Sequence, residues 1–172
     1  MYLRSDATPD RLSGVLFGIP SGVAGVRATL YLMRDLVRRY RTDLAVRERA
    51  AALTQHLPQK SWTREIRALH EYVRDGIRYL KDTNGVEVVQ TPVVTMAVKH
   101  GDCDDKATLL AALLESIGHP ARFVAVGFEP GKYSHVYVES KIGEQWAPLE
   151  TTSMMSPGMA PLRIVQRMIV KV

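Results

Sequence analysis

The sequence predicts a single α+β domain in which a group of helices precedes an antiparallel sheet. Two observations support this prediction. Apolar residues recur at three- and four-residue steps through residues 26–80 and 103–117, whereas from Ala121 onward they alternate every second residue. A chain of 172 residues is also long enough to bury one core. Helices that come before strands, rather than between them, are typical of the α+β class.

We expect residues 1–23 to form an N-terminal arm and residues 24–172 to form the domain. The first 23 residues mix Gly, Pro, Ser and Asp and show no sustained period. Their short apolar run, VLFGIP, is broken by Gly18 and Pro20, so it fits neither a signal peptide nor a membrane span. We therefore expect no transmembrane segment, and we expect the protein to be cytoplasmic when it is made.

Three helices are predicted in the first part of the domain. The second runs from Asp43 towards Leu57, and the third starts at Ser61 as its N-cap. The apolar side of the first helix is expected to consist of Val26, Leu30, Met33, Val37 and Tyr40. The apolar stripe of the third is expected to consist of Trp62, Ile66, Leu69, Val73, Ile77 and Leu80.

Residues 81–101 are predicted to be a turn-rich connection, because they contain an Asn-Gly pair, a proline and a glycine. One short extended piece, VEVVQ, lies within this connection. The next helix has Cys103 in its first turn and ends at Gly118. Its buried side is expected to consist of Leu110, Leu113, Leu114 and Ile117.

Four segments after this helix have a period of two and predict antiparallel strands: ARFVAVGF, SHVYVES, QWAPLE and LRIVQRMIVKV. The second and third segments are expected to form a hairpin through a turn at residues 141–143. In the second segment, alternation puts His135, Tyr137 and Glu139 on one polar side and valines on the other. A histidine on such a side can point into a cleft.

The net charge of +5 is concentrated in residues 27–78, which hold twelve Lys and Arg against six Asp and Glu. A basic surface can attract nucleic acid. However, RDLVRRYR at 34–41 interleaves its arginines with apolar residues, as solvated helix faces do. Charge alone is weak evidence, so we do not expect a nucleic-acid partner.

Cys103 is the chain's single cysteine, so neither an internal disulfide nor a thiolate zinc site can form. At a helix N-terminus, free N–H groups and the helix dipole favour the thiolate. Three acids surround the thiol, Asp102, Asp104 and Asp105, and their charge should favour the protonated form instead. An inert buried thiol and a nucleophile both remain open at this point.

A cysteine nucleophile needs a base and a group that orients the base. His135 is the candidate base, and Glu150, at the end of the next strand, is the candidate orienting carboxylate. Taken singly, Cys103 fits a buried hydrophobe, His135 a core histidine and Glu150 a solvated carboxylate. Their combination, in this order and on these elements, favours a catalytic site.

The sequence resembles the transglutaminase-like superfamily of papain-like cysteine enzymes. GDCDDKATLLAALLESIGHPARFVAVGF matches the cysteine motif of that family, SHVYVE its histidine motif and EQWAPLETT its acid motif. The resemblance runs from about Ile77 to Thr152 and is nearest to small bacterial and bacteriophage transglutaminase-like cysteine proteinases. It implies a papain-like fold and acyl-transfer chemistry on a peptide or protein substrate.

The resemblance also implies the roles of individual residues. Cys103 would attack an amide carbonyl, His135 would transfer protons and Glu150 would orient His135. The oxyanion hole would consist of the Cys103 backbone N–H, with the Gln90 side chain as a second donor. The family usually presents aspartate where Glu150 stands, so the carboxylate here is one methylene longer. No cofactor is required for this chemistry.

Two explanations of the aspartates remain open. One is helix capping, with Asp102 as the N-cap and Asp104 and Asp105 complementing the helix dipole. The other is calcium, because some bacterial members of the resembled family bind it through acids flanking the cysteine, the positions of Asp102 and Asp104. A bound cation would cancel the local negative charge and favour the thiolate.

A cysteine peptidase or amidase is the first functional prediction. The second is a catalytically silent fold used for binding, for instance a structural protein of a phage particle with a virion partner and a virion location. The third is a transglutaminase that joins Gln to Lys, which shares the acyl-enzyme with hydrolysis. Reactivity of Cys103 towards alkylation separates the first reading from the second.

Overall fold

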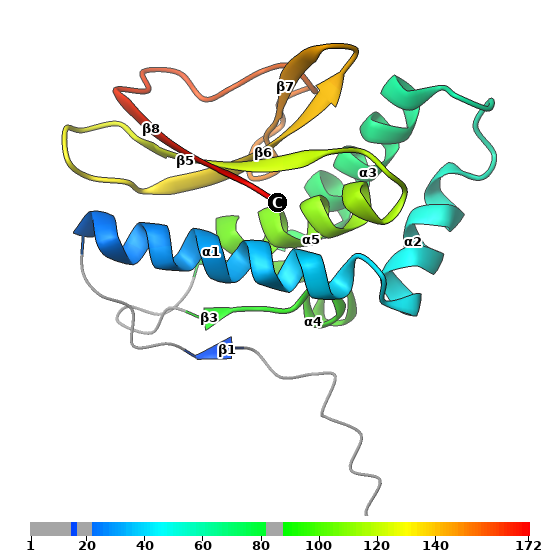
Figure 1. Cartoon of the computed structure of the whole chain (residues 1–172), viewed down its shortest axis with the longest axis horizontal. Coiled ribbons are helices and arrows are strands. Elements are labelled where there is room, and N and C mark those ends of the chain that lie inside the picture. The colour runs from blue at the N-terminus through cyan, green and yellow to red at the C-terminus, as the bar shows by residue number, and fades with distance from the viewer. Residues whose placement is uncertain (1–14, 17–21, 82–87) are drawn as a thin grey trace, which may run out of the picture.

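The computed structural model describes residues 15–16, 22–81 and 88–172. Its largest sheet has four strands and packs on a group of helices (Figure 1). The central helix is α5 (Cys103–Ser116), which contacts the sheet and four further helices. These are α1 (Gly22–Tyr40), α2 (Leu44–Thr54), α3 (Trp62–Gly76) and α4 (Pro92–Val98). The predicted α+β class is confirmed.

The sheet is antiparallel throughout and has the strand order β7-β6-β5-β8. Its strands are β5 (Ala121–Gly127), β6 (His135–Ile142), β7 (Gln145–Leu149) and β8 (Gln166–Lys171). The β6–β7 hairpin turns at residues 143–144, because Ile142 pairs with Gln145. The turn predicted at 141–143 is therefore displaced, and Gly143 supplies the positive φ of 62° that the turn requires.

Helix α5 is buried on all sides, not on the single side expected from the sequence. Every residue from Asp105 to Leu114 is buried, because the helices cover the faces that the sheet leaves open. Ile117, which was expected in the buried stripe, is the C-cap and only half-buried. The helix ends at Ser116, two residues before the predicted stop at Gly118, and Gly118 has a left-handed conformation (φ 90°).

The predicted helices form, with local corrections. α1 begins at Gly22, inside the stretch assigned to the arm. In α3, the expected stripe is wrong at both ends, since Trp62 is 60% exposed and Leu80, which lies beyond the helix, is 48% exposed. Ser61 stands at the N-cap position of α3, but its hydroxyl donates to the Pro58 carbonyl (2.6 Å) and makes no capping bond.

Helix α4 lies within the predicted turn-rich connection, so that prediction was wrong over Pro92–Val98. The Thr91 hydroxyl caps it by accepting from the Val94 N–H (3.4 Å), and Pro92 occupies a first-turn position where no donor is needed. Within VEVVQ, Val88–Val89 forms strand β3, which pairs with β1 (Val15–Leu16). The rest of the predicted N-terminal arm up to residue 21 lies outside the described residues.

A short pair of parallel strands lies directly before Cys103. Strand β2 (Arg78–Tyr79) pairs with β4 (His100–Gly101), which leads directly into α5. A Cβ at Gly101 would lie 2.6 Å from the Cβ of Asp105. Glycine is therefore required here for the backbone to pass beside the start of α5.

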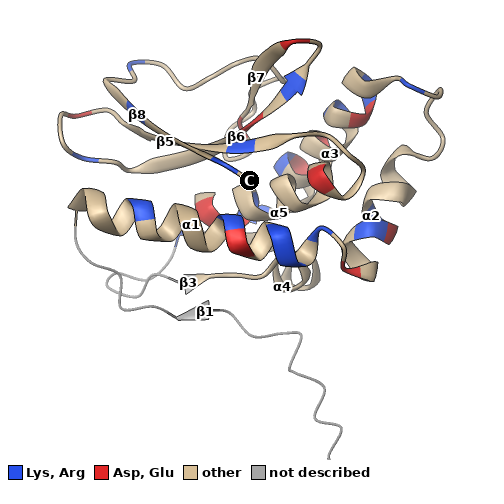
Figure 2. Ribbon diagram, viewed as in Figure 1, with Lys and Arg blue, Asp and Glu red and all other residues tan. Residues whose placement is uncertain are grey.

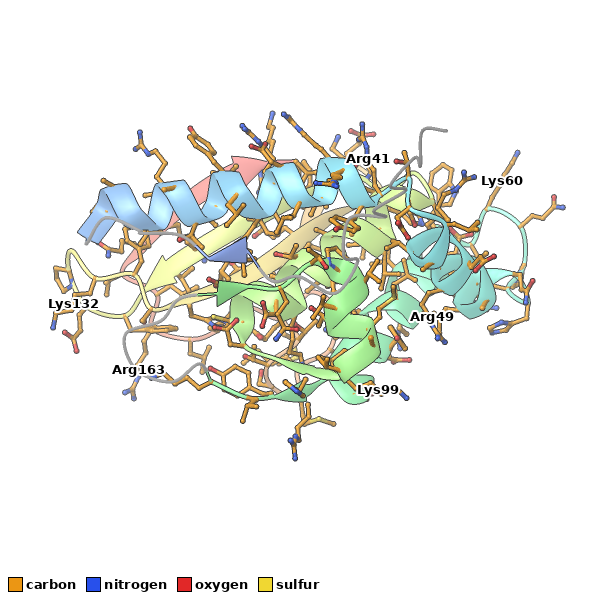
Figure 3. All side chains as sticks on the ribbon, turned by 90° about the horizontal axis from the view of Figure 1, so that it is seen from below. Arg41, Arg49, Lys60, Lys99, Lys132 and Arg163 are labelled. Atoms are coloured by element: carbon orange, nitrogen blue, oxygen red, sulfur yellow. The ribbon has the colours of Figure 1, made fainter. Side chains whose placement is uncertain are left out.

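Basic and acidic side chains are interspersed along the helices (Figure 2). The basic residues labelled in Figure 3 come from separate elements and point outward: Arg41, Arg49, Lys60, Lys99, Lys132 and Arg163. Among the helices that the structure describes, none is long and apolar enough to cross a membrane.

Candidate active site

Cys103 is the first residue of α5, as predicted, and its position is set by a capping box. Asp102 Oδ1 accepts hydrogen bonds from the N–H groups of Asp104 (2.9 Å) and Asp105 (3.3 Å), and Asp105 Oδ2 accepts from the Asp102 N–H (3.2 Å). The other Asp105 oxygen accepts from the Gln90 N–H (2.7 Å). The buried Asp105 carboxylate thus joins the segment before α4 to the start of α5.

His135 is the first residue of β6, and it lines the same cleft as Cys103. Its neighbour Val136 lines this cleft too, and α5 and β6 are in contact, so the start of this strand lies near the start of α5. The cleft has a volume of about 210 Å³. Two residues that are 32 positions apart in the sequence therefore share one site.

Glu150 directly follows β7, where hairpin pairing returns the chain to His135. Its Oε2 lies 2.6 Å from His135 Nε2. Its Oε1 accepts from the Thr152 N–H and from the Thr152 hydroxyl, both at 2.7 Å. Burial tends to raise the pKa of Glu150, but the bonds from His135 and Thr152 outweigh it and hold this pKa below its ordinary value. The carboxylate is therefore ionised at neutral pH.

The contact between Glu150 and His135 determines which imidazole nitrogen of His135 carries the proton. Because an ionised carboxylate only accepts, Nε2 carries a proton and donates it to Glu150. In the neutral ring, Nδ1 is then the unprotonated nitrogen. Nδ1 is the atom that can take a proton from a group in the cleft.

Two buried residues interact with Glu150, His70 through a hydrogen bond and Lys106 through its charge. His70 of α3 is fully buried, and its Nε2 lies 2.6 Å from the Glu150 carbonyl oxygen. Since a carbonyl only accepts, this nitrogen carries the proton, and burial lowers the pKa of His70, which keeps the ring neutral. Lys106 of α5 donates to the Ile77 (2.5 Å) and Arg74 (3.2 Å) carbonyls at the end of α3. Burial lowers its pKa to about 8, and the Glu150 charge opposes this shift.

The surroundings of Cys103 favour the thiol over the thiolate. Burial raises its pKa, and the charges of Asp104 and Asp102 raise it further. The Val136 N–H acts in the opposite direction but is outweighed. The thiol donates to Asp104 Oδ1 over 3.4 Å. Burial and the two aspartates together hold the pKa of Cys103 above its ordinary value.

The sulfur of Cys103 and the carboxylates of Asp102 and Asp104 could hold a cation. One ligand atom from each lies within 4.8 Å of the others. Two carboxylates suit a hard cation such as calcium, and positive charge here would oppose the effects that raise the thiol pKa. Asp102 Oδ1 also accepts the capping hydrogen bond from the Asp104 N–H. Helix capping and cation binding by Asp102 are therefore compatible.

The remaining predicted residues lie as follows. Gln90 does not line the cleft, and its Oε1 accepts from the Thr95 hydroxyl (3.3 Å). The predicted polar side of β6 is covered, because Tyr137 and Glu139 are 1% and 4% exposed, and Tyr137 packs with residues of the 150–165 segment. Only His135 on that side reaches the cleft.

Sequence reasoning missed several residues that hold the site together: His70, Asp105 as the second member of the capping box, Lys106 and Thr152. The Asp-x-x-Asp spacing at the start of α5 was the available signal for Asp105. His70 and Lys106 gave no comparable signal, because their partners are backbone carbonyls of distant segments.

The fold and the site together define a class: an α+β domain of papain-like organisation, in which a cysteine at the start of the central helix lines the same cleft as a histidine of the sheet, and this histidine contacts a carboxylate. The profile of the transglutaminase-like superfamily matches residues 47–151, well over half of the chain. The chain belongs to this superfamily. No curated protein matches it significantly.

Several solved structures share the fold. A protein of Parabacteroides distasonis, provisionally assigned as a protease, aligns with a TM-score of 0.64 and 14% identity over 84% of this chain. A provisionally assigned cysteine protease of Cytophaga hutchinsonii gives 0.53 and 18% over 80%. Calcium-bound LapG of Legionella pneumophila gives 0.52 and 17% over 74%. The alignments span 29%, 50% and 75% of those proteins, so this chain matches only part of the first two.

Replacing Glu150 by Gln is expected to lower kcat/KM by about 10²- to 10⁴-fold, less than loss of the nucleophile. The amide can present its N–H to His135 and so favour the wrong tautomer. Steady-state kinetics on a peptide amide measure the effect, with Glu144→Gln, at the exposed β6–β7 turn, as the matched control. Kinetics equal to those of the control would show that Glu150 does not orient His135.

Replacing His70 by Leu is expected to destabilise the protein by about 1–3 kcal/mol, because the buried Glu150 carbonyl loses its donor. His70→Gln, whose amide can still donate, should recover part of this loss. Urea unfolding measures both variants. If Leu and Gln give equal stabilities, the hydrogen bond to Glu150 contributes nothing beyond packing.

Proposed function

We propose that this protein is a cysteine peptidase or amidase that hydrolyses a peptide substrate through Cys103, His135 and Glu150. The observation that carries the proposal is the 2.6 Å contact of His135 with Glu150, since His135 lines the same cleft as Cys103. A buried, ionised carboxylate that fixes a histidine beside a cysteine is the arrangement that nucleophilic catalysis requires. The solved relatives with protease assignments agree with this class.

The first half of the reaction forms an acyl-enzyme. His135 Nδ1 takes the Cys103 proton as the sulfur bonds to the substrate carbonyl carbon, and Glu150 stabilises the imidazolium. The Cys103 N–H, which has no partner within its own helix at this position, donates to the oxyanion. Gln90, the second donor that the sequence predicts, does not line the cleft in this structure. The C–N bond then breaks, and the His135 proton passes to the leaving amine.

The second half returns the enzyme to its starting state. A water molecule gives a proton to His135 Nδ1 and attacks the thioester carbonyl carbon. The C–S bond breaks, and the sulfur recovers the proton from His135. Burial and the charges of Asp104 and Asp102 raise the thiol pKa, so the role proposed for His135 is to take the proton from Cys103 as the sulfur attacks.

Calcium is a proposed ligand of this site and not a reactant. Asp102 and Asp104 would hold it, and the calcium-bound state of LapG supports the idea. The bound cation would supply positive charge that lowers the Cys103 pKa. None of the reaction steps described above requires calcium as a reactant.

Trapping the acyl-enzyme tests the proposed function. The protein is mixed with p-nitrophenyl acetate and with a degenerate peptide library, quenched in acid and analysed by mass spectrometry. We expect an acyl adduct on Cys103 and cleaved peptides, both absent in Cys103→Ala. Added primary amine separates the outcomes, since a transglutaminase would transfer the acyl group to it. A protein without adduct or cleavage would support the catalytically silent reading.

A further inference from the structure

The oxyanion hole of the proposed reaction has room for a further donor. Of the two donors that the sequence predicts, Gln90 does not line the cleft, which leaves the backbone N–H of Cys103. Preorganised donors around the developing negative charge are a large part of acyl-transfer catalysis, and loss of one donor typically slows the reaction by about 10²- to 10³-fold. A second donor would have to come from the side chains that line the cleft with Cys103.

Tyr79 is such a residue, since it lines the cleft together with Cys103 and His135. It is the second residue of β2, and the pairing of β2 with β4 places it opposite Gly101. The Leu80 N–H donates to the Gly101 carbonyl (3.0 Å), so this register continues beyond Tyr79. Paired strands lie about 4.8 Å apart, and Gly101 is two residues before Cys103. Tyr79 therefore lies beside the start of α5, on the cysteine's side of the cleft.

The state of the Tyr79 side chain suits a hydrogen-bond donor. The residue is 46% exposed, so a molecule in the cleft can reach it. Its hydroxyl makes no hydrogen bond to another residue that the structure describes. Burial raises the pKa of this hydroxyl, and negative charge at Cys103 and Asp102 raises it further. The phenol is therefore protonated at neutral pH and keeps a proton to donate.

Other hydroxyl groups that line the cleft fit this role less well. Thr29 is 7% exposed, and its hydroxyl already donates to a carbonyl of its own helix (3.2 Å). Tyr133 and Ser134 directly precede His135 in the chain, so they belong to the side of the cleft that holds the base. A second donor has to converge with the Cys103 N–H on one oxygen atom. This requirement favours a side chain beside the start of α5.

We propose that the Tyr79 hydroxyl is the second oxyanion donor of the proposed reaction. The proposal rests on the proposed function and adds a catalytic residue to it. As the Cys103 sulfur bonds to the carbonyl carbon, the π electron pair of the carbonyl moves onto its oxygen, and the phenol O–H donates to that oxygen. When the C–N bond breaks, the pair returns to the carbonyl. Tyr79 keeps its proton throughout and forms no covalent bond.

Removal of the hydroxyl tests the proposal on a peptide amide substrate. Tyr79→Phe keeps the ring and leaves the backbone pairing of β2 in place. We expect kcat to fall by about 10²- to 10³-fold with KM near its wild-type value, because the donor acts on charge that develops only in the transition state. The matched control is Tyr31→Phe in α1, at a residue that is 43% exposed and does not line the cleft. Equal kinetics of the two variants would overturn the proposal.

Two reagents show whether Tyr79 acts on the oxyanion or on the thiol. Acylation of Cys103 by p-nitrophenyl acetate passes through an oxyanion, whereas alkylation by iodoacetamide is a displacement at a saturated carbon and forms none. We expect Tyr79→Phe to slow acylation by at least about 10-fold and to leave the alkylation rate close to that of wild type. Equal losses in both reactions would show that Tyr79 acts on the reactivity of the sulfur, and would overturn the proposal.

The same measurements separate failure of the Tyr79 role from failure of the proposed function. Acylation that is independent of Tyr79, in a protein that cleaves peptides, rejects the oxyanion role alone. Acylation that depends on Tyr79, in a protein that cleaves no peptide, supports the oxyanion role and rejects the peptidase. Lys81 also lines the cleft, so Lys81→Met is measured beside Tyr79→Phe. An acylation-specific loss in Lys81→Met but not in Tyr79→Phe would assign the donor to Lys81 and overturn the proposal.

Discussion

Cys103→Ala and His135→Ala are each expected to reduce acyl transfer by at least about 10⁴-fold and to leave the fold intact. The sulfur supplies the bond to the acyl group, and His135 supplies both proton transfers, so no neighbouring group replaces either. Both residues are only partly buried, and alanine leaves the capping box of α5 in place because Asp102 and Asp105 form it. The double variant should be no slower than either single variant, because the two residues act as a unit.

Circular dichroism and thermal unfolding provide the control for these variants, together with His56→Ala at an exposed position near the end of α2. Normal turnover in Cys103→Ala would reject the enzyme reading altogether. Normal turnover in His135→Ala alone would show that the proton acceptor is another group, and the contact with Glu150 would then be structural.

Asp104→Asn is expected to accelerate alkylation of Cys103 at pH 7 by about 10- to 100-fold in the presence of chelator. The substitution removes a negative charge next to the sulfur, and each unit by which the thiol pKa falls corresponds to about 1.36 kcal/mol. The sign follows from the structure, since the Asp104 charge raises the pKa of Cys103. Iodoacetamide rates from pH 6 to 10 measure the shift, with Asp43→Asn, the N-cap of α2, as the matched control.

Calcium should have the same effect on the wild-type protein if Asp102 and Asp104 bind it. Added calcium should then accelerate alkylation and raise the melting temperature, because binding to the native state alone stabilises it. Asp104→Asn should start from the faster rate, respond weakly to calcium and show weaker binding in titration calorimetry. No heat of binding and a chelator-independent wild-type rate would leave the aspartates as helix-capping and dipole-complementing groups.

Much of the architecture follows from the sequence because it depends on local periodicity. The helical spacing of α1, the alternation of β5 and β6, and the end of α5 close to Gly118 are consequences of neighbouring residues. Cys103 at a helix start depends on an adjacent N-cap, which is also local. These features were predictable without knowledge of tertiary contacts, and so was the order of the three proposed catalytic residues.

Burial predicted from local sequence patterns was wrong where it depends on segments that are distant in the sequence. Helix α5 has too few charged residues to be a surface helix, but only its packing against α1, α2, α3, α4 and the sheet shows that every side is covered. Trp62 is 60% exposed, although its spacing matched the stripe. The short α4 is determined by the Thr91 cap and its packing on α5 more than by its own propensity.

By itself, the sequence determined the class of fold, the family and the three residues proposed for catalysis. Only the tertiary structure decided their chemical state. The Nε2 contact of His135 assigns its tautomer, Thr152 and His70 hold Glu150, and burial with two aspartates raises the pKa of the Cys103 thiol. The physical reason is that protonation depends on desolvation and on charges within a few ångströms, and these neighbours come from α3, α5, β6 and the segment after β7.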